Sequence, residues 1–258
     1  MATRGKSPDL QHSLTLLWEG RSPGRRGPRA RLTVEGIAQA AIRIADADGL
    51  EALSMQRIAA ELGYSTMSIY NHIPSKDLLL EVVADVAAGR PPEPDRADDF
   101  RYAVRHWVGA LWAGFQTRPW LLRVPLDHAP IGPNQLAWLD RLLRPLLVAG
   151  LRGGEARAAA LHLTAVVRGT AQISTDLTSA HRTDDGHPRT EAEVAQVLAG
   201  FIDPDVYPAL AAVHAAESAE VERERDALPA ELSFGVDRFL DGVEAWVARR
   251  GRESSVRR

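Results

Sequence analysis

The chain has 258 residues, long enough for one large or two ordinary domains, and a formal net charge of −3. Its content of 45% hydrophobic residues is enough for a proper core. It contains no cysteine, which excludes a disulfide framework and a thiol redox switch and is typical of cytoplasmic proteins. No signal-peptide pattern is visible, and no apolar run approaches the ~20 residues of a membrane helix. We therefore expect a cytoplasmic protein without a membrane partner.

Residues 1–32 form a basic segment that we expect to be largely disordered, because its Gly, Pro and Arg residues give no pattern that could bury a face. It holds seven Lys/Arg against two acidic residues, a charge of +5. Two interpretations stay open: a solvated tail, or an arm that contacts the DNA backbone or minor groove. The arm would use Arg25, Arg26, Arg29 and Arg31. The apolar run Leu14–Trp18 is explained by neither, and docking on the body of the protein is an alternative for it.

The sequence pattern of residues 33–90 predicts a set of short helices. Thr33 is a suitable N-cap for a first helix that runs to about Asp48 and ends at Gly49. Ser54 caps a second helix, and Gly63 ends it because glycine accepts the left-handed conformation of a helix stop. The apolar residues of this second helix fall at i, i+3, i+4 and i+7, namely Met55, Ile58, Ala59 and Leu62.

A third helix follows Ser65, and its apolar residues are too few to bury more than one side. Only Ile69 and Ile73 are aliphatic at core spacing. Hydroxyls, an amide, an imidazole and a phenol are left on the outer face, and these groups suit hydrogen bonds to base edges and phosphates. The pair of helices therefore predicts a helix-turn-helix whose second member is the recognition helix. Ser75 would cap a further helix that connects this domain to the rest of the chain.

Roles in DNA binding follow from side-chain chemistry. Tyr70 and Lys76 are placed to meet phosphates, whereas Asn71 can pair bidentately with adenine and Met67 or Thr66 can touch a thymine methyl. Alternatively, one or two candidates are only solvated, and Met67 is partly core. The full predicted set is Gln56, Arg57, Ser65, Thr66, Met67, Ser68, Tyr70, Asn71, His72 and Lys76.

The run from Leu32 to about Val86 resembles the DNA-binding domain of the tetracycline-repressor (TetR) family of transcriptional regulators. The matching segments include Ala47-Asp48-Gly49-Leu50, Leu62-Gly63-Tyr64-Ser65 and Ile69-Tyr70-Asn71-His72-Ile73-Pro74-Ser75-Lys76-Asp77-Leu78. A weaker similarity, Arg118-Pro119-Trp120-Leu121 followed by Gly132-Pro133-Asn134, points to the tetracycline-repressor-like C-terminal subgroup. The resemblance implies a homodimer paired through two late helices, a double-stranded DNA operator and a small-molecule effector.

A Gly/Pro-rich cluster at 89–94 marks the domain boundary, and the sequence of residues 91–258 predicts helices without a strand. We expect helices over about 100–118, 132–149, 155–177 and 233–249, with Pro145 kinking the second of them. Aromatic residues in the middle of this region are candidates for an apolar effector cavity, although such a stripe is also typical of an ordinary core. The candidate effector residues are Trp107, Leu111, Phe115, Trp120, Trp138 and His162, the last expected to be a buried neutral histidine.

No metal-ligand spacing, nucleophile motif or phosphate-binding loop appears, so we expect no metal, no cofactor and no enzyme activity. The sequence thus predicts an all-α protein with a basic arm (1–32), a helix-turn-helix domain of three helices (33–90) and a helical ligand-binding and dimerisation domain (91–258). We expect a repressor that binds a palindromic operator as a dimer and is released by a small apolar or amphipathic effector. The alternative is a small-molecule-binding or interaction module without operator-specific DNA binding.

Overall fold

The computed structural model describes residues 10–19, 32–96, 98–125, 129–180, 193–194, 197–198, 200–217 and 228–256, which contain helices and no strand. The all-α prediction is therefore confirmed for this part of the chain. The α-helices are α1 (Leu10–Glu19), α2 (Val34–Asp48), α3 (Met55–Leu62), α4 (Thr66–Tyr70), α5 (Lys76–Ala88), α6 (Phe100–Thr117), α7 (Pro133–Val148), α8 (Gly153–Ala180), α10 (Pro208–Glu217) and α11 (Ala230–Val256). Two 3-10 helices, η1 (Leu50–Ala52) and η2 (Pro119–Arg123), complete the order.

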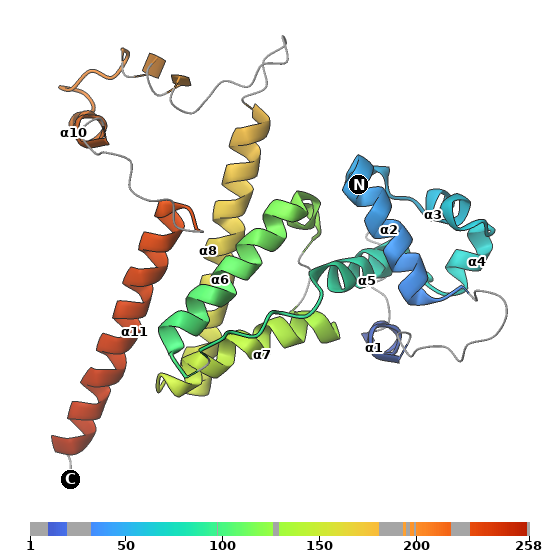
Figure 1. The fold of residues 1–258 in the computed structure, drawn as a ribbon, viewed down its shortest axis with the longest axis horizontal. Helices are drawn as coiled ribbons and strands as arrows, with labels where there is room; N and C mark the ends of the chain where they lie inside the picture. The colour runs from blue at the N-terminus through green and yellow to red at the C-terminus, as the bar shows by residue number, and fades with distance from the viewer. Residues whose placement is uncertain are drawn as a thin grey trace, which may run out of the picture.

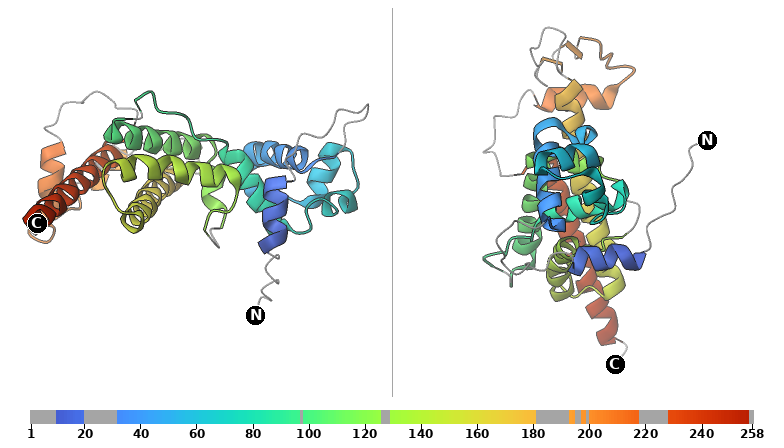
Figure 2. Two further views of the ribbon diagram at one scale, coloured as in Figure 1. Left: turned by 90° about the horizontal axis from the view of Figure 1, so that it is seen from below. Right: turned by 90° about the vertical axis from the view of Figure 1, so that its right-hand side faces the viewer.

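Helices α2 to α4 form a small head, and α5 leads from it into the body of α6, α7, α8 and α11 (Figure 1). The view from below in Figure 2 shows the head and the body side by side, with α5 between them. Helix α5 packs against α2 on the head side and against α7 on the body side. This helix therefore joins the two parts through packing on both of its sides.

The predicted helix ends of the head are confirmed. The hydroxyls of Thr33, Ser54, Ser65 and Ser75 each accept a hydrogen bond from a backbone N–H three residues later, at 3.0 to 3.2 Å. Gly63 adopts the left-handed conformation, with φ of 72°, and its backbone N–H bonds back into α3. These caps satisfy backbone groups that helix ends leave open, so they fix where each short helix begins and ends.

Two apolar clusters hold the fold together. The first joins the head helices to α5 and to Trp120 and Val124 beyond α6, and it also includes Leu17 of α1. The second lies among α6, α7, α8 and α11 and includes Val108, Leu146 and Leu240. The apolar stripes read from the sequence form these clusters, since Ile37, Ile58 and Ile69 of the head are fully buried.

The structure corrects the expectation that residues 1–32 lack any packed face. Residues 10–19 form α1, and the side chain of Leu17 is only 1% exposed. The four apolar residues between 14 and 18 are too few to build a core alone. They are enough to dock a short helix against the apolar cluster of the head and α5. Residues 20–31, with Arg25, Arg26, Arg29 and Arg31, lie outside the described residues.

The helix bounds in the body differ slightly from the expected ones. Helices α8 and α11 extend beyond 155–177 and 233–249, to Gly153–Ala180 and Ala230–Val256. The additional turns are rich in polar residues that form helix without an apolar period, which is why hydrophobic spacing did not detect them. Helix α7 continues through Pro145.

Candidate DNA-binding and effector sites

The recognition helix α4 is held down by few side chains and leaves the rest of its surface open. Ile69 and Ile73 are fully buried beneath it, whereas Met67 is 68% and Tyr70 is 42% exposed, and Asn71 also lies in solvent. The alternative that Met67 is partly core is therefore wrong. The outer face of α4 therefore carries side chains that we predicted, from their chemistry, to contact bases and phosphates.

Several of the predicted DNA contacts already have partners within the head. The Ser65 and Ser68 hydroxyls lie 2.8 Å apart, and His72 Nδ1 is 2.9 Å from the Ser68 carbonyl oxygen. Arg57 forms an ion pair with Asp48. These contacts orient the half-buried side chains of α4, whereas Gln56 and Lys76 are exposed on its flanks and Thr66 is half-buried. The assignment of individual DNA contacts remains a prediction.

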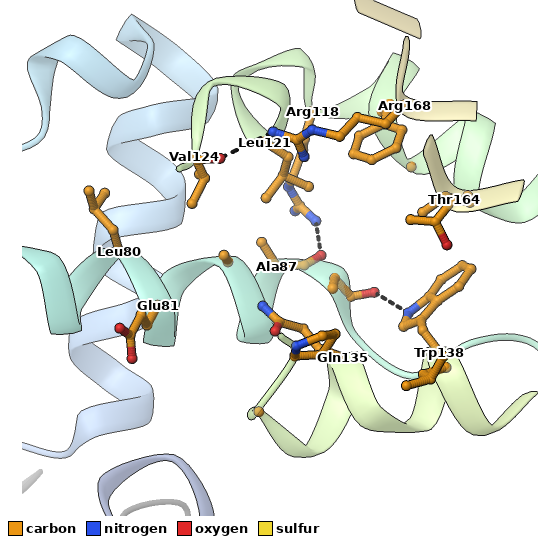
Figure 3. A pocket seen from close by; sticks show the side chains of 18 of the residues that line it. Leu80, Glu81, Ala87, Arg118, Leu121, Val124, Gln135, Trp138, Thr164 and Arg168 are labelled. Carbon is orange, nitrogen blue, oxygen red and sulfur yellow. Dashed lines mark hydrogen bonds between the residues drawn. The ribbon is translucent and has the colours of Figure 1, made fainter. Parts of the chain in front are cut away.

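A cavity of about 610 Å³ lies at the junction of head and body (Figure 3). Its walls come from α5, α6, α7 and α8, from the segments around η2 and before α7, and from α1. Its volume is in the range of small-molecule sites in proteins. Leu80, Ala84 and Ala87 of α5 form one wall, so a molecule that fills the cavity would touch the helix that leads into the head.

The aromatic side of this cavity is built by two tryptophans. Trp107 and Trp138 meet edge to face, with ring centroids 5.9 Å apart. Trp107 Nε1 donates to the Trp138 carbonyl oxygen at 2.9 Å, and Trp138 Nε1 donates to the Gly89 carbonyl oxygen at 3.0 Å. Their polar atoms are thus satisfied by backbone, so the rings present apolar surface to the cavity together with Leu111 and Phe115.

Arg168 supplies the most unusual charge in the cavity. Its guanidinium donates to the carbonyl oxygens of Leu122 and Val124 at 2.6 and 3.1 Å, and it lies 5.9 Å from the Phe115 ring centroid. No carboxylate among the described residues forms an ion pair with it. Burial lowers the pKa of Arg168 below its ordinary value. Among the described residues, two backbone carbonyl dipoles and an aromatic face balance this partly buried positive charge.

Two carboxylates connect this cavity to the head. Asp46 of α2 accepts from Arg118 Nε at 3.2 Å and from Trp120 Nε1 at 2.7 Å, while Arg118 also donates to the Ala87 carbonyl oxygen at 3.2 Å. Arg118 lines the cavity (Figure 3), so the same side chain contacts the cavity, α5 and α2.

The second connection is made by Asp85, which is fully buried in α5. Its carboxylate accepts from the backbone N–H groups of Gln135 at 2.8 Å and Asn134 at 3.4 Å, at the first turn of α7. A negative charge at a helix N-terminus is stabilised by the helix dipole. A Cβ atom added to Gly132 would collide with this carboxylate, so the approach of α5 to α7 requires glycine there.

The structure brings together four of the six predicted effector residues: Trp107, Leu111, Phe115 and Trp138. Trp120 does not line this cavity: its side chain lies in the first apolar cluster, and its Nε1 donates to Asp46. His162 is also elsewhere, and the expectation of a buried histidine is wrong. It lies exposed on α8, where it stacks on Phe239 of α11 at 5.1 Å in a separate groove.

Sequence reasoning missed Arg118, Gln135, Thr164, Arg168 and Leu17, all of which line the cavity. Arg168 offered a usable signal, because it is the one charged residue in the apolar stretch of α8 between Arg157 and Asp176. The described residues contain no cluster of His, Asp or Glu that could hold a metal ion. Within them, no helix is long and apolar enough to cross a membrane.

Comparison with known proteins decides the family. The model of bacterial regulatory proteins of the tetR family matches residues 32–83, and the model of the tetracyclin repressor-like C-terminal domain matches residues 92–247. The chain belongs to the TetR family. It is therefore a ligand-responsive, DNA-binding transcriptional regulator that acts as a homodimer, and the resemblance read from the sequence is confirmed.

Relatives of this TetR-family regulator are similar over nearly its whole length. The HTH-type transcriptional repressor DrrR1 of Streptomyces coeruleorubidus is 34% identical, over 96% of this chain and 91% of its own. Apo ActR from Streptomyces coelicolor is 25% identical with a TM-score of 0.68, over 86% of this chain and 100% of that one. ActR in complex with actinorhodin is 26% identical with a TM-score of 0.67, over 84% of this chain and 99% of that one.

Proposed function

We propose that this regulator is a repressor that binds a palindromic operator in the cytoplasm and is released by a planar aromatic compound carrying an acidic group. The observation that carries the effector class is Arg168, a partly buried guanidinium in a cavity with an aromatic wall. DrrR1 is named a repressor, and ActR has been crystallised with actinorhodin and with (S)-DNPA. Both relatives support a repressor that responds to a small molecule.

The aromatic part of the proposal rests on the shape of the cavity wall. The flat rings of Trp107 and Trp138 meet at an interplanar angle of 71°, and Leu111 and Leu139 extend this apolar surface. Flat aromatic ligands gain most from such walls, because stacking adds to the burial of apolar area. Gln135 and Thr164 offer a small number of hydrogen-bonding groups that would fix the ligand's orientation.

The acidic part rests on the charge of Arg168. A guanidinium removed from water is costly unless an anion pairs with it. Carboxylates or phenolates pair with arginine through short, charge-assisted hydrogen bonds. An anionic effector would therefore recover the solvation that Arg168 loses, whereas a neutral one of the same shape would not.

Release from DNA would follow from the position of α5. An effector in the cavity touches α5 directly and touches α2 through Arg118 and Asp46. It would favour a head arrangement that no longer matches two successive major grooves, ~34–36 Å apart. By linkage, operator DNA must weaken effector binding by the same factor.

The test starts from an operator selected with the purified protein from random sequences. Anthraquinone-2-carboxylate and its neutral carboxamide are then compared for their ability to release that operator in a gel-shift or anisotropy titration. We expect the carboxylate to act at a concentration about tenfold lower, a difference of ~1.4 kcal/mol, and Arg168→Gln to remove this preference. Arg123→Gln, an exposed arginine on η2, serves as the matched control. Equal potency of the two compounds in the wild type would show that the effector need not be an anion.

A further inference from the structure

Helix α1 lies outside both segments that define the family, residues 32–83 and 92–247, and yet it is part of the cavity. It lies beside α5 and the start of α7 in Figures 1 and 2. Leu17 is 1% exposed, belongs to the apolar cluster against which Leu80 and Ile131 pack, and lines the cavity with them. A residue that belongs to neither matched segment therefore completes one wall.

A second contact fixes the same corner of the molecule. Trp18 Nε1 donates to the Ile131 carbonyl oxygen at 3.0 Å, across 113 positions of sequence. Ile131 and Gly132 line the cavity and immediately precede α7, whose first turn is capped by Asp85 of α5. Helix α1 thus contacts both the side chains of the wall and the backbone that leads into the next wall.

We propose that α1 is an integral wall of the effector site: Leu17 contacts the bound effector, and Trp18 holds the 130–132 segment in place. The inference rests on the proposed function, in which this cavity takes the effector. Two consequences follow. Effector affinity depends on α1, and a bound effector stabilises the docking of α1 on the body.

The second consequence follows from how little holds α1. A helix of ten residues is marginal by itself, so its docking depends on contacts to the body. In the described side chains these contacts include Leu17, the partly buried Leu16 and the Trp18 hydrogen bond. An effector that fills the space beside Leu17 adds contacts to this small set, and the opening of α1 should become rarer by the same linkage.

Hydrogen exchange of the α1 amides tests the inference in the full-length protein. We expect anthraquinone-2-carboxylate to slow exchange over residues 10–19 at least threefold in the wild type. Leu17→Ala should weaken binding of this probe at least fivefold, measured by tryptophan fluorescence, and Trp18→Phe should weaken it to a smaller extent. Glu19→Gln, an exposed change on the same helix, should leave probe affinity within twofold of the wild type. Operator affinity without probe should be unchanged in all three.

Leu17→Trp separates contact from docking. The larger side chain should fill part of the cavity and weaken probe binding, while α1 without probe stays at least as protected as in the wild type. If Leu17→Ala and Leu17→Trp bind the probe normally while Arg168→Gln binds it weakly, the role of α1 is wrong and the proposed site stands. If neither the Leu17 variants nor Arg168→Gln changes probe binding, the cavity is not the probe site and the proposed function itself fails.

Discussion

Tyr70, the last residue of α4, and Asn71, its C-cap, are both exposed but offer different chemistry to DNA. An amide can make two hydrogen bonds to one adenine, whereas a phenol next to the groove wall can only position the helix on a phosphate. Both side chains project from a helix that Ile69 and Ile73 hold in place, so truncating either one should leave the head folded.

The first prediction uses this difference. Tyr70→Ala should weaken binding to operator and non-operator DNA by similar factors. Asn71→Ala should instead lose discrimination at one base pair, worth ~1–3 kcal/mol if the contact is bidentate. Competition titrations with operators carrying single substitutions measure both effects. Wild-type operator affinity in both variants, with unchanged circular dichroism, would remove α4 as the reading element.

At the scale of elements, Glu155 ties the start of α8 to the end of α11. Its carboxylate accepts from the backbone N–H of Arg152 at 2.7 Å, from Arg250 at 2.7 Å and from Trp246 Nε1 at 3.1 Å. These hydrogen bonds, that from Arg152 first, lower the pKa of Glu155 from 4.5 to about 2. A carboxyl group whose pKa is lower in the folded state stabilises that state above its unfolded pKa.

The second prediction follows from the sign of this shift. Glu155→Gln should lower the melting temperature at pH 7, and the difference from the wild type should persist down to about pH 4.5. Between pH 4.5 and about pH 2 the difference should shrink, because the wild-type carboxyl group becomes protonated. Thermal unfolding in a pH series measures this difference, and Asp140→Asn, at an exposed position of α7, is the control. A difference that does not vary with pH would mean that Glu155 acts by packing alone.

The arginines of the segment between α1 and α2 can be tested apart from α1. Deleting residues 1–28 would remove the buried Leu17 as well as the charges, so we expect that deletion to lower stability and to confound the result. The third prediction therefore replaces Arg21, Arg25, Arg26, Arg29 and Arg31 by alanine. Operator affinity should fall, and the slope of log affinity against log salt should become shallower by ~0.9 per lost phosphate contact. The same five positions changed to lysine should keep the slope; an unaltered slope in the alanine variant would make the segment a solvated tail.

How far the sequence predicts each element depends on the range of the interactions that fix it. The caps at Ser54, Ser65 and Ser75 act within three residues, so residue type and spacing located them. Trp107 and Trp138 were predicted as cavity residues because aromatic stripes mark either a core or a pocket. Trp120 was misplaced, because its partner Asp46 is 74 residues away, a pairing that periodicity cannot show. Leu17 was missed for the same reason, since only the fold brings it to α5.

At the scale of the whole molecule, a regulator of this family works as a dimer, and the described chain leaves apolar side chains unburied where α8 and α11 run together. Leu161, Ile173, Phe234 and Trp246 are large and exposed in the single chain. Such a surface is typical of a subunit interface rather than of a free monomer surface. Because the two heads must contact the two half-sites at the same time, a small shift of each head changes operator affinity strongly.

The shift must pass from the cavity to the head through contacts that both share, and the Arg118–Asp46 pair is the most direct of these. Arg118 lines the cavity, bonds to Ala87 at the end of α5 and holds Asp46 of α2. Both side chains of the pair are about one-third exposed, with exposed fractions of 32% and 38%. Ion pairs of this exposure add less than ~1 kcal/mol to stability, so their removal should leave the fold intact.

The fourth prediction is that Asp46→Asn uncouples the two sites. The amide keeps the shape of the carboxylate but loses the charge that holds Arg118, so a bound effector should move the head less. We expect operator affinity without effector and probe affinity without operator to stay within about threefold of the wild type. Saturating anthraquinone-2-carboxylate should weaken operator binding less than in the wild type, and the coupling free energy should fall by ~0.5–2 kcal/mol, the size of coupling changes at positions between two sites.

Asp48→Asn, on the same helix but paired with Arg57 of the head, is the matched control. By reciprocity the same reduction must appear when probe affinity is measured with and without operator, and a reduction in only one direction would show that the measurement, not the pair, is at fault. Full coupling in Asp46→Asn would assign transmission to the contacts of α5, which forms a wall of the cavity and carries the Asp85 cap on α7.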